Sequence, residues 1–175
     1  MTILVLAEQR DGILKKASFE ATRAAASLAA QLGASVTALL IGGTADAAAS
    51  LGGYGASKVL HVTDERLALY ANSAFTTVAA EAAMKESADV VLLPATSMGK
   101  DLAPRLAVRL DAAVAPDVTA LTVEGGDIIA QRPIYAGKAV ESIRVTTARK
   151  VFTLRPNVFT AGQPDGNAAA VEPFA

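Results

Sequence analysis

The chain has 175 residues, enough for one domain with a hydrophobic core, and its 52% hydrophobic content excludes an intrinsically disordered protein. A net charge of −1 without a basic patch argues against a nucleic-acid partner, and the absence of cysteine excludes disulfides, thiol catalysis and cysteine metal sites. No apolar run reaches the roughly 18 residues of a membrane span, and the first residues, MTILVLAEQRDG, lack the basic leader of a signal peptide, so we expect a cytoplasmic protein.

Strand-like and helix-like segments alternate through the first 111 residues. Short apolar runs predict buried strands at residues 2–8, 34–42, 58–62 and 89–94. Apolar residues at helical spacing predict helices at residues 15–33, 66–87 and 98–111, and a short, glycine-interrupted helix at 44–55. Because such alternation requires crossover connections, we expect a three-layer, Rossmann-like α/β fold, with a parallel sheet covered by helices on both faces.

The chain after residue 112 has a different pattern, rich in β-forming residues and tight turns. Gly125-Gly126 and Gly137-Lys138 each predict a two-residue hairpin turn, so we expect a β-hairpin or meander region towards the carboxy terminus. Residues 157–175 are mostly Gly, Pro, Ala and Asn with little periodicity. This composition predicts a linker or disordered tail after a main domain of residues 1–156.

The stretch PATSMGKDLAPRLAVRL, residues 94–110, is the candidate nucleotide loop. A P-loop needs a glycine five residues before its Gly-Lys pair and a Ser or Thr directly after it. Pro94 and Asp101 occupy these two positions, and an acidic side chain there repels phosphate. The sequence therefore excludes a P-loop.

A weaker anion site stays open at this loop, because it follows a predicted parallel strand and precedes a helix amino terminus. Its candidate residues are Thr96, Ser97, Gly99, Lys100 and Asp101. The alternative interpretation is structural. Asp101, Arg105 and Arg109 recur every four residues, which predicts ion pairs along one row of the helix, beside a row of leucines facing the core.

No set of residues forms a persuasive catalytic constellation. His61 lies in an apolar run, which favours a packed histidine, and one histidine without cysteine predicts no metal site. The serines lack the context of a nucleophile elbow. The glycine-rich LGGYG at residues 51–55 lacks the spacing of a dinucleotide fingerprint. We therefore expect a protein that is not an enzyme by itself.

Three segments together resemble the alpha subunit of electron transfer flavoproteins. They are ILVLAEQRDGIL at residues 3–14, GKDLAPRLAVRLDAAVAPDVTAL at 99–121 and RPIYAGKAVESI at 132–143. Their order and spacing, closed by KVFTLRPNVF, are more specific than any one of them, and the resemblance covers about residues 1–160. Lys138 departs from the family, which commonly has asparagine there.

The resemblance implies an adenine nucleotide alpha hydrolase-like fold and the role of an amino-terminal scaffold domain. The complete heterodimer of this family carries electrons on FAD from acyl-CoA-type dehydrogenases of fatty acid beta-oxidation, through a quinone oxidoreductase, towards the quinone pool. In this family the FAD lies mainly in a further domain, and the beta subunit carries AMP. We therefore expect no cofactor on residues 1–175 alone, a vestigial loop at 95–101, and a tail leading towards that further domain.

The resemblance also implies that this domain docks on the beta subunit. The candidate interface residues are Arg132, Tyr135, Gly137 and Lys138. With such surfaces exposed, the isolated domain is expected to self-associate. The alternative is a stand-alone adenine-nucleotide-binding module resembling universal stress proteins, although their glycine-rich phosphate loop is not visible here. A third hypothesis, an enzyme that uses the 95–101 loop, lacks a nucleophile and a base.

Overall fold

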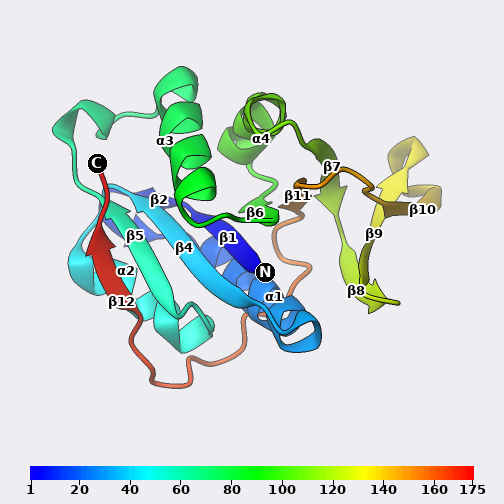
Figure 1. The fold of residues 1–175 in the computed structure, drawn as a ribbon, viewed down its shortest axis with the longest axis horizontal. Coiled ribbons are helices and arrows are strands. Elements are labelled where there is room, and N and C mark those ends of the chain that lie inside the picture. The colour runs from blue at the N-terminus through cyan, green and yellow to red at the C-terminus, as the bar shows by residue number, and fades with distance from the viewer.

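The computed structural model describes residues 1–175 and is built around a seven-stranded, entirely parallel sheet (Figure 1). In spatial order its strands are β12 (Ala170–Pro173), β5 (Lys58–Val62), β4 (Ser35–Ile41), β1 (Thr2–Ala7), β6 (Val90–Pro94), β11 (Lys150–Leu154) and β7 (Ala113–Val118). The expected α/β class with a parallel sheet is confirmed. It includes all four strands predicted from the first half of the chain.

Helices cover both faces of this sheet, so its strands are buried on both sides. The helices are α1 (Lys16–Leu32), α2 (Ala45–Ser50), α3 (Asn72–Lys85) and α4 (Ser97–Arg109), with 3₁₀ turns at Leu51–Tyr54, Glu65–Leu67 and Tyr135–Gly137. Alternate residues of β1 divide between two cores: Ile3 and Val5 pack with α1, whereas Leu4 and Leu6 pack with α3 and α4. This double burial explains why the strands read as continuous apolar runs.

The strand order places a topological switch between β1 and β6. The chain moves from β1 to β4 and β5 on one side, and then crosses to β6 and β11 on the other. In open α/β sheets, ligands bind at the carboxyl ends of the strands on either side of such a switch. The loop after β6 lies at this place, and so does a small hairpin after β1, formed by β2 (Gln9–Arg10) and β3 (Ile13–Leu14).

A three-stranded antiparallel sheet projects from one side of the main body (Figure 1). It consists of β8 (Ala120–Glu124), β9 (Asp127–Ile134) and β10 (Ala139–Arg144), which confirms the expected meander. The predicted two-residue turn at Gly125-Gly126 is also confirmed. Glu124 pairs with Asp127, and both glycines have positive φ, 60° and 88°, as a type I′ turn requires.

The second predicted turn is wrong in length. Ile134 pairs with Ala139, so the connection from β9 to β10 is a four-residue loop, Tyr135–Lys138, and not a two-residue turn at Gly137-Lys138. Tyr135, Ala136 and Gly137 all have positive φ, at 51°, 55° and 87°. Tyr and Ala rarely adopt this conformation, so only the glycine signalled the turn in the sequence.

The prediction of a linker or disordered tail at residues 157–175 is wrong for the last residues. Ala170–Pro173 forms β12, which pairs in parallel with β5 at the edge of the main sheet. The segment before it is held by Arg23 of α1, whose guanidinium donates to the carbonyls of Ala161, Gln163 and Gly53 at 2.9–3.0 Å. A four-residue strand held by tertiary contacts leaves no local periodicity in the sequence. The end of the tail is therefore part of the main sheet, and Ala161 and Gln163 before it are tied to α1.

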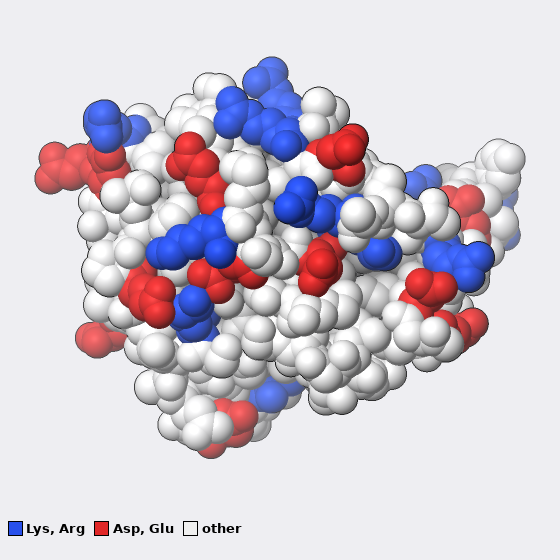
Figure 2. All heavy atoms as spheres, viewed as in Figure 1, with Lys and Arg blue, Asp and Glu red and all other residues white.

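Charged side chains of both signs are interspersed on the face shown in Figure 2, in line with the net charge of −1. This face therefore presents no broad field of one sign, of the kind that steers nucleic acid. None of the helices combines the length and the apolar character needed to span a bilayer.

Candidate functional site

The loop after β6 is organised by Thr96, which caps α4. Its Oγ1 accepts a hydrogen bond of 3.1 Å from the backbone N–H of Gly99. The same hydroxyl donates its proton to Oε1 of Glu8, 2.5 Å away. Both hydrogen-bonding capacities of Thr96 are thus used inside the protein, one of them on a carboxylate.

Glu8 follows β1 and is only 2% exposed, so its carboxylate lies inside the switch between β1 and β6. Its Oε2 is 3.4 Å from Nζ of Lys15, and its backbone N–H and C=O are both bound by the hydroxyl of Ser18. A negative group therefore sits beside the amino terminus of α4, where a bound phosphate would otherwise lie. Sequence reasoning missed this role, although an acidic residue directly after an apolar strand was a visible signal.

Gly99 is required by packing. A Cβ on this residue would stand 1.8 Å from the carbonyl oxygen of Pro94 and 3.6 Å from Oε1 of Glu8. The glycine lets α4 approach the end of β6 more closely than any other residue would allow. The Gly-Lys pair therefore reflects helix–strand contact, and the neighbouring Ser97 and Lys100 are exposed.

Asp101 is held by a different partner from the one expected. Its carboxylate accepts hydrogen bonds from Nδ2 of Asn72 at 2.5 Å and from the hydroxyl of Tyr70 at 2.7 Å. These two bonds hold the pKa of Asp101 below its usual value, and burial together with the Asp101 carboxylate raises the pKa of Tyr70 to about 12. The predicted row of ion pairs from Asp101 through Arg105 to Arg109 is wrong, because neither arginine forms one.

An open pocket of about 700 Å³ lies above this loop and is lined with charges of both signs. Arg10 and Lys15 contribute positive charge, and Asp11 and Asp101 contribute negative charge. A small cavity of about 70 Å³ beneath it is lined partly by Glu8. The two cations are already paired, Arg10 with Asp11 and Lys15 with Glu8, and a nucleotide phosphate here would also meet the Asp101 carboxylate, so these residues do not fit a phosphate. His61 is packed as expected, with Nε2 3.0 Å from the carbonyl oxygen of Gly42.

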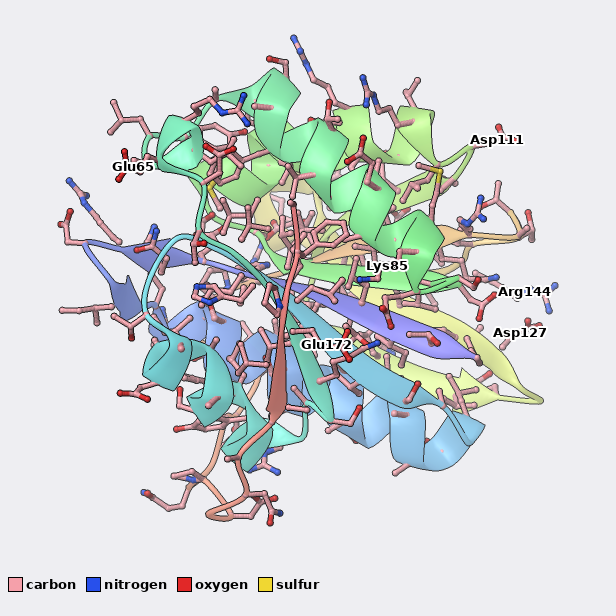
Figure 3. All side chains as sticks on the ribbon, turned by 60° about the vertical axis from the view of Figure 1, so that its left-hand side comes forward. Glu65, Lys85, Asp111, Asp127, Arg144 and Glu172 are labelled. Carbon is pink, nitrogen blue, oxygen red and sulfur yellow. The ribbon has the colours of Figure 1, made fainter.

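The candidate interface residues lie together at one end of the projecting sheet. Arg132 of β9 pairs with Glu141 of β10 at 3.0 Å. Tyr135 is 77% exposed, and Gly137 and Lys138 are also exposed in the same loop. At the other end of this sheet, Arg144 and Asp127 form an ion pair of 3.2 Å and point into solvent (Figure 3). The loop 135–138 therefore presents an aromatic ring and a lysine to solvent.

A further ion pair lies where β7, β9 and β11 come together, and no pattern in the sequence indicates it. The Arg155 guanidinium binds both carboxylate oxygens of Asp117, with Nε–Oδ1 at 3.0 Å and Nη2–Oδ2 at 2.5 Å. Arg155 holds the pKa of Asp117 below its usual value, and the positive charges of Lys100 and Arg132 add to this effect. Lys100, Arg132 and Arg155 come from the segments 99–121, 132–143 and KVFTLRPNVF of the resemblance. These three segments therefore all contribute positive charge near the Asp117 carboxylate.

Comparison with known proteins supports the resemblance over nearly the whole chain. The family model described as "Electron transfer flavoprotein domain" matches residues 3–175. The chain is 37% identical over 164 residues to the electron transfer flavoprotein subunit alpha of Bacillus subtilis, covering 93% of this chain and 50% of that protein. It is 35% identical over 173 residues to the alpha subunit of Pseudomonas aeruginosa, covering 98% of this chain and 53% of that protein.

A further relative is the acryloyl-CoA reductase electron transfer subunit beta of Anaerotignum propionicum, 36% identical over 123 residues, which cover 70% of this chain and 34% of that protein. The chain spans about half the length of the two alpha subunits. The fold, the matched family and these identities agree. The chain therefore belongs to the electron transfer flavoprotein family of FAD-containing electron carriers and corresponds to the amino-terminal domain of an alpha subunit.

Proposed function

We propose that this domain is a scaffold in an FAD-containing heterodimer that carries electrons from acyl-CoA-type dehydrogenases through a quinone oxidoreductase towards the quinone pool. The observation that carries the scaffold role is the Glu8–Thr96 hydrogen bond, which fills the sheet's usual nucleotide position with the protein's own carboxylate. A pyrophosphate does not fit beside Glu8 and Asp101, so FAD would be held mainly outside residues 1–175. The domain then contributes surface and rigidity to the carrier, not redox chemistry.

The dehydrogenase class is supported by one relative. One protein similar to this chain has a name that describes an electron transfer subunit of an acryloyl-CoA reductase. An acyl-CoA-type partner for the complete heterodimer agrees with that name.

The beta subunit docks on the projecting sheet in this proposal. Tyr135 and Val140 are 77% and 63% exposed there and are the exposed large hydrophobic residues of this small sheet. Exposed aromatic and apolar side chains flanked by charges are typical of the centre and rim of an interface. The isolated domain would self-associate through the same surface when the beta subunit is absent.

The experiment is size-exclusion chromatography of residues 1–175 mixed with the beta subunit from the same organism. We expect a stable complex that Tyr135→Ser weakens, because an exposed aromatic anchor is removed. Ile13→Ser is the matched control, since Ile13 is 74% exposed on the distant β2–β3 hairpin. If the parent, Tyr135→Ser and Ile13→Ser all form the complex equally well, the proposed docking surface is wrong. If the parent elutes separately from the beta subunit, the scaffold role is contradicted.

The alternative is a stand-alone adenine-nucleotide module resembling universal stress proteins. It requires the pocket beside Glu8 to accept a phosphate. Calorimetric titration with AMP, ADP and ATP separates the two proposals. The scaffold role predicts no binding tighter than roughly 1 mM, a free energy of about 4 kcal/mol. A micromolar dissociation constant would favour the nucleotide module.

A further inference from the structure

A groove of about 460 Å³ separates α3 and α4 on the outer face of the molecule, away from the projecting sheet. Ser73 and Thr77 of α3 line one side, and Pro104, Val108 and two arginines of α4 line the other. Val108 is 82% exposed, although it is a large apolar residue on a helix whose opposite face is buried. The groove therefore combines hydroxyl groups, a small apolar patch and positive charge.

The two arginines of the groove, Arg105 and Arg109, form no ion pair within the chain, although the charge of Arg105 helps to lower the pKa of Asp101. Five of the other arginines form ion pairs with Asp or Glu, and Arg23 donates to backbone carbonyls. Asp101, one helical turn before Arg105, is engaged instead by Asn72 and Tyr70. Figure 2 shows basic side chains gathered at the top of this face, over α4.

We propose that the groove between α3 and α4 is a docking site for an acidic segment of a partner protein. Arg105 and Arg109 stand one helical turn apart, about 6 Å along the axis. Carboxylates on alternate residues of an extended peptide repeat at nearly this distance, about 6.6 Å. Each guanidinium then takes one carboxylate, and the aliphatic part of the segment covers Val108. This partner binds a different surface from the beta subunit, so the site goes beyond the scaffold role.

The apolar wall distinguishes this occupant from a small anion. A single phosphate can bind the guanidinium groups but leaves Val108 exposed. An acidic segment reaches both arginines and buries the valine as well, because its backbone runs along the groove.

The test is fluorescence anisotropy of a labelled peptide of alternating glutamate and alanine, titrated with residues 1–175 at low salt. A peptide of alternating glutamine and alanine is the matched probe control. We expect the glutamate peptide to bind with a submillimolar dissociation constant and the glutamine peptide not to bind. The double variant Arg105→Gln/Arg109→Gln should weaken binding of the glutamate peptide about tenfold, because each exposed charge pair contributes modestly. Raising the salt to about 0.15 M weakens binding through screening.

The matched protein control is Arg149→Gln, because Arg149 also has no ion-pair partner but does not line the groove. We expect it to bind the acidic peptide like the parent.

The proposal is overturned if the parent does not bind the acidic peptide, if the double variant binds it equally well, or if Arg149→Gln weakens binding as much as the double variant does. Displacement of the peptide by millimolar inorganic phosphate would assign the groove to a small anion instead. Self-association lost in the double variant would assign it to a second copy. Arg105 and Arg109 are exposed and Arg149 is half-buried at the surface, and none of the three forms an ion pair, so thermal melting should be unchanged in each variant.

Discussion

The carboxylate of Glu8 and the hydroxyl of Thr96, 88 residues apart in the chain, form a 2.5 Å hydrogen bond across the switch between β1 and β6. This bond joins the end of one strand to the cap of the helix that follows the other. It satisfies a buried carboxylate and at the same time occupies the position that nucleotides use in open α/β sheets.

Replacing Glu8 by alanine should lower the free energy of unfolding by about 1–3 kcal/mol, because Thr96 and the backbone around it lose a buried partner. Urea unfolding followed by circular dichroism measures this change. Glu65→Ala is the control, since Glu65 is exposed and its loss should cost no more than about 0.5 kcal/mol. Equal stability of the two variants would mean that the Glu8 contact contributes nothing to the fold.

Replacing Gly99 by alanine should be severe for a single added methyl group. The new Cβ would collide with the carbonyl of Pro94, at 1.8 Å, and α4 would have to move. We expect a loss of about 3 kcal/mol, at the upper end for overpacking. Ser97→Ala, an exposed position in the same helical turn, is the control. A thermal melt of Gly99→Ala that matches this control would disprove the close approach of α4 to β6.

Gly137→Val tests the four-residue loop of the projecting sheet. Gly137 has φ of 87° with open space around it, so the cost is backbone strain and not collision. We expect destabilisation by about 1–3 kcal/mol. Lys138→Val is the control, because it places the same valine side chain at a residue with an ordinary φ of −73°. It should leave the free energy of unfolding almost unchanged. An unchanged melting temperature for Gly137→Val would contradict this loop conformation.

The Asp117–Arg155 pair predicts a pH dependence of stability. The pKa of Asp117 is lowered in the folded protein, so its ionised form stabilises the fold. That stabilisation is complete above the ordinary carboxyl pKa of about 4 and is lost as the pH falls through the lower folded pKa. Asp117→Asn tolerates the positive φ of 61° but cannot ionise. The parent should melt higher than this variant at neutral pH, and the gap should close in acid. A gap that stays constant with pH would rule out the ion pair as its cause.

The first half of the fold could be predicted because its signals are local. Apolar runs and helical spacing between residues 2 and 111 predict the strands and long helices, and α1 ends before Gly33, whose φ of 62° suits a helix end. The later strands were harder to assign. β7, with the sequence AVAPDV, contains Pro116, which disfavours a central strand, but it lies at the edge of the main sheet, where proline is tolerated.

The location of the candidate site could be predicted from the sequence, but its contacts could not. The loop after β6 was identified because it follows a strand and precedes a helix. What decides its chemistry are contacts between distant residues: Glu8 with Thr96, Asp101 with Asn72, and Asp117 with Arg155. No periodicity encodes such pairs. Local reasoning instead predicted the ion pair of Asp101 with Arg105, a neighbour four residues away, which the tertiary structure replaces.

The central claim is that this domain supports a flavin carrier without holding the flavin itself. The most direct measurement is the visible absorbance of purified residues 1–175 after incubation with excess FAD and removal of free cofactor. We predict a colourless protein, because Glu8 and Asp101 place carboxylates where a pyrophosphate needs donors. A yellow protein with stoichiometric FAD would contradict the account and place the flavin site within this domain.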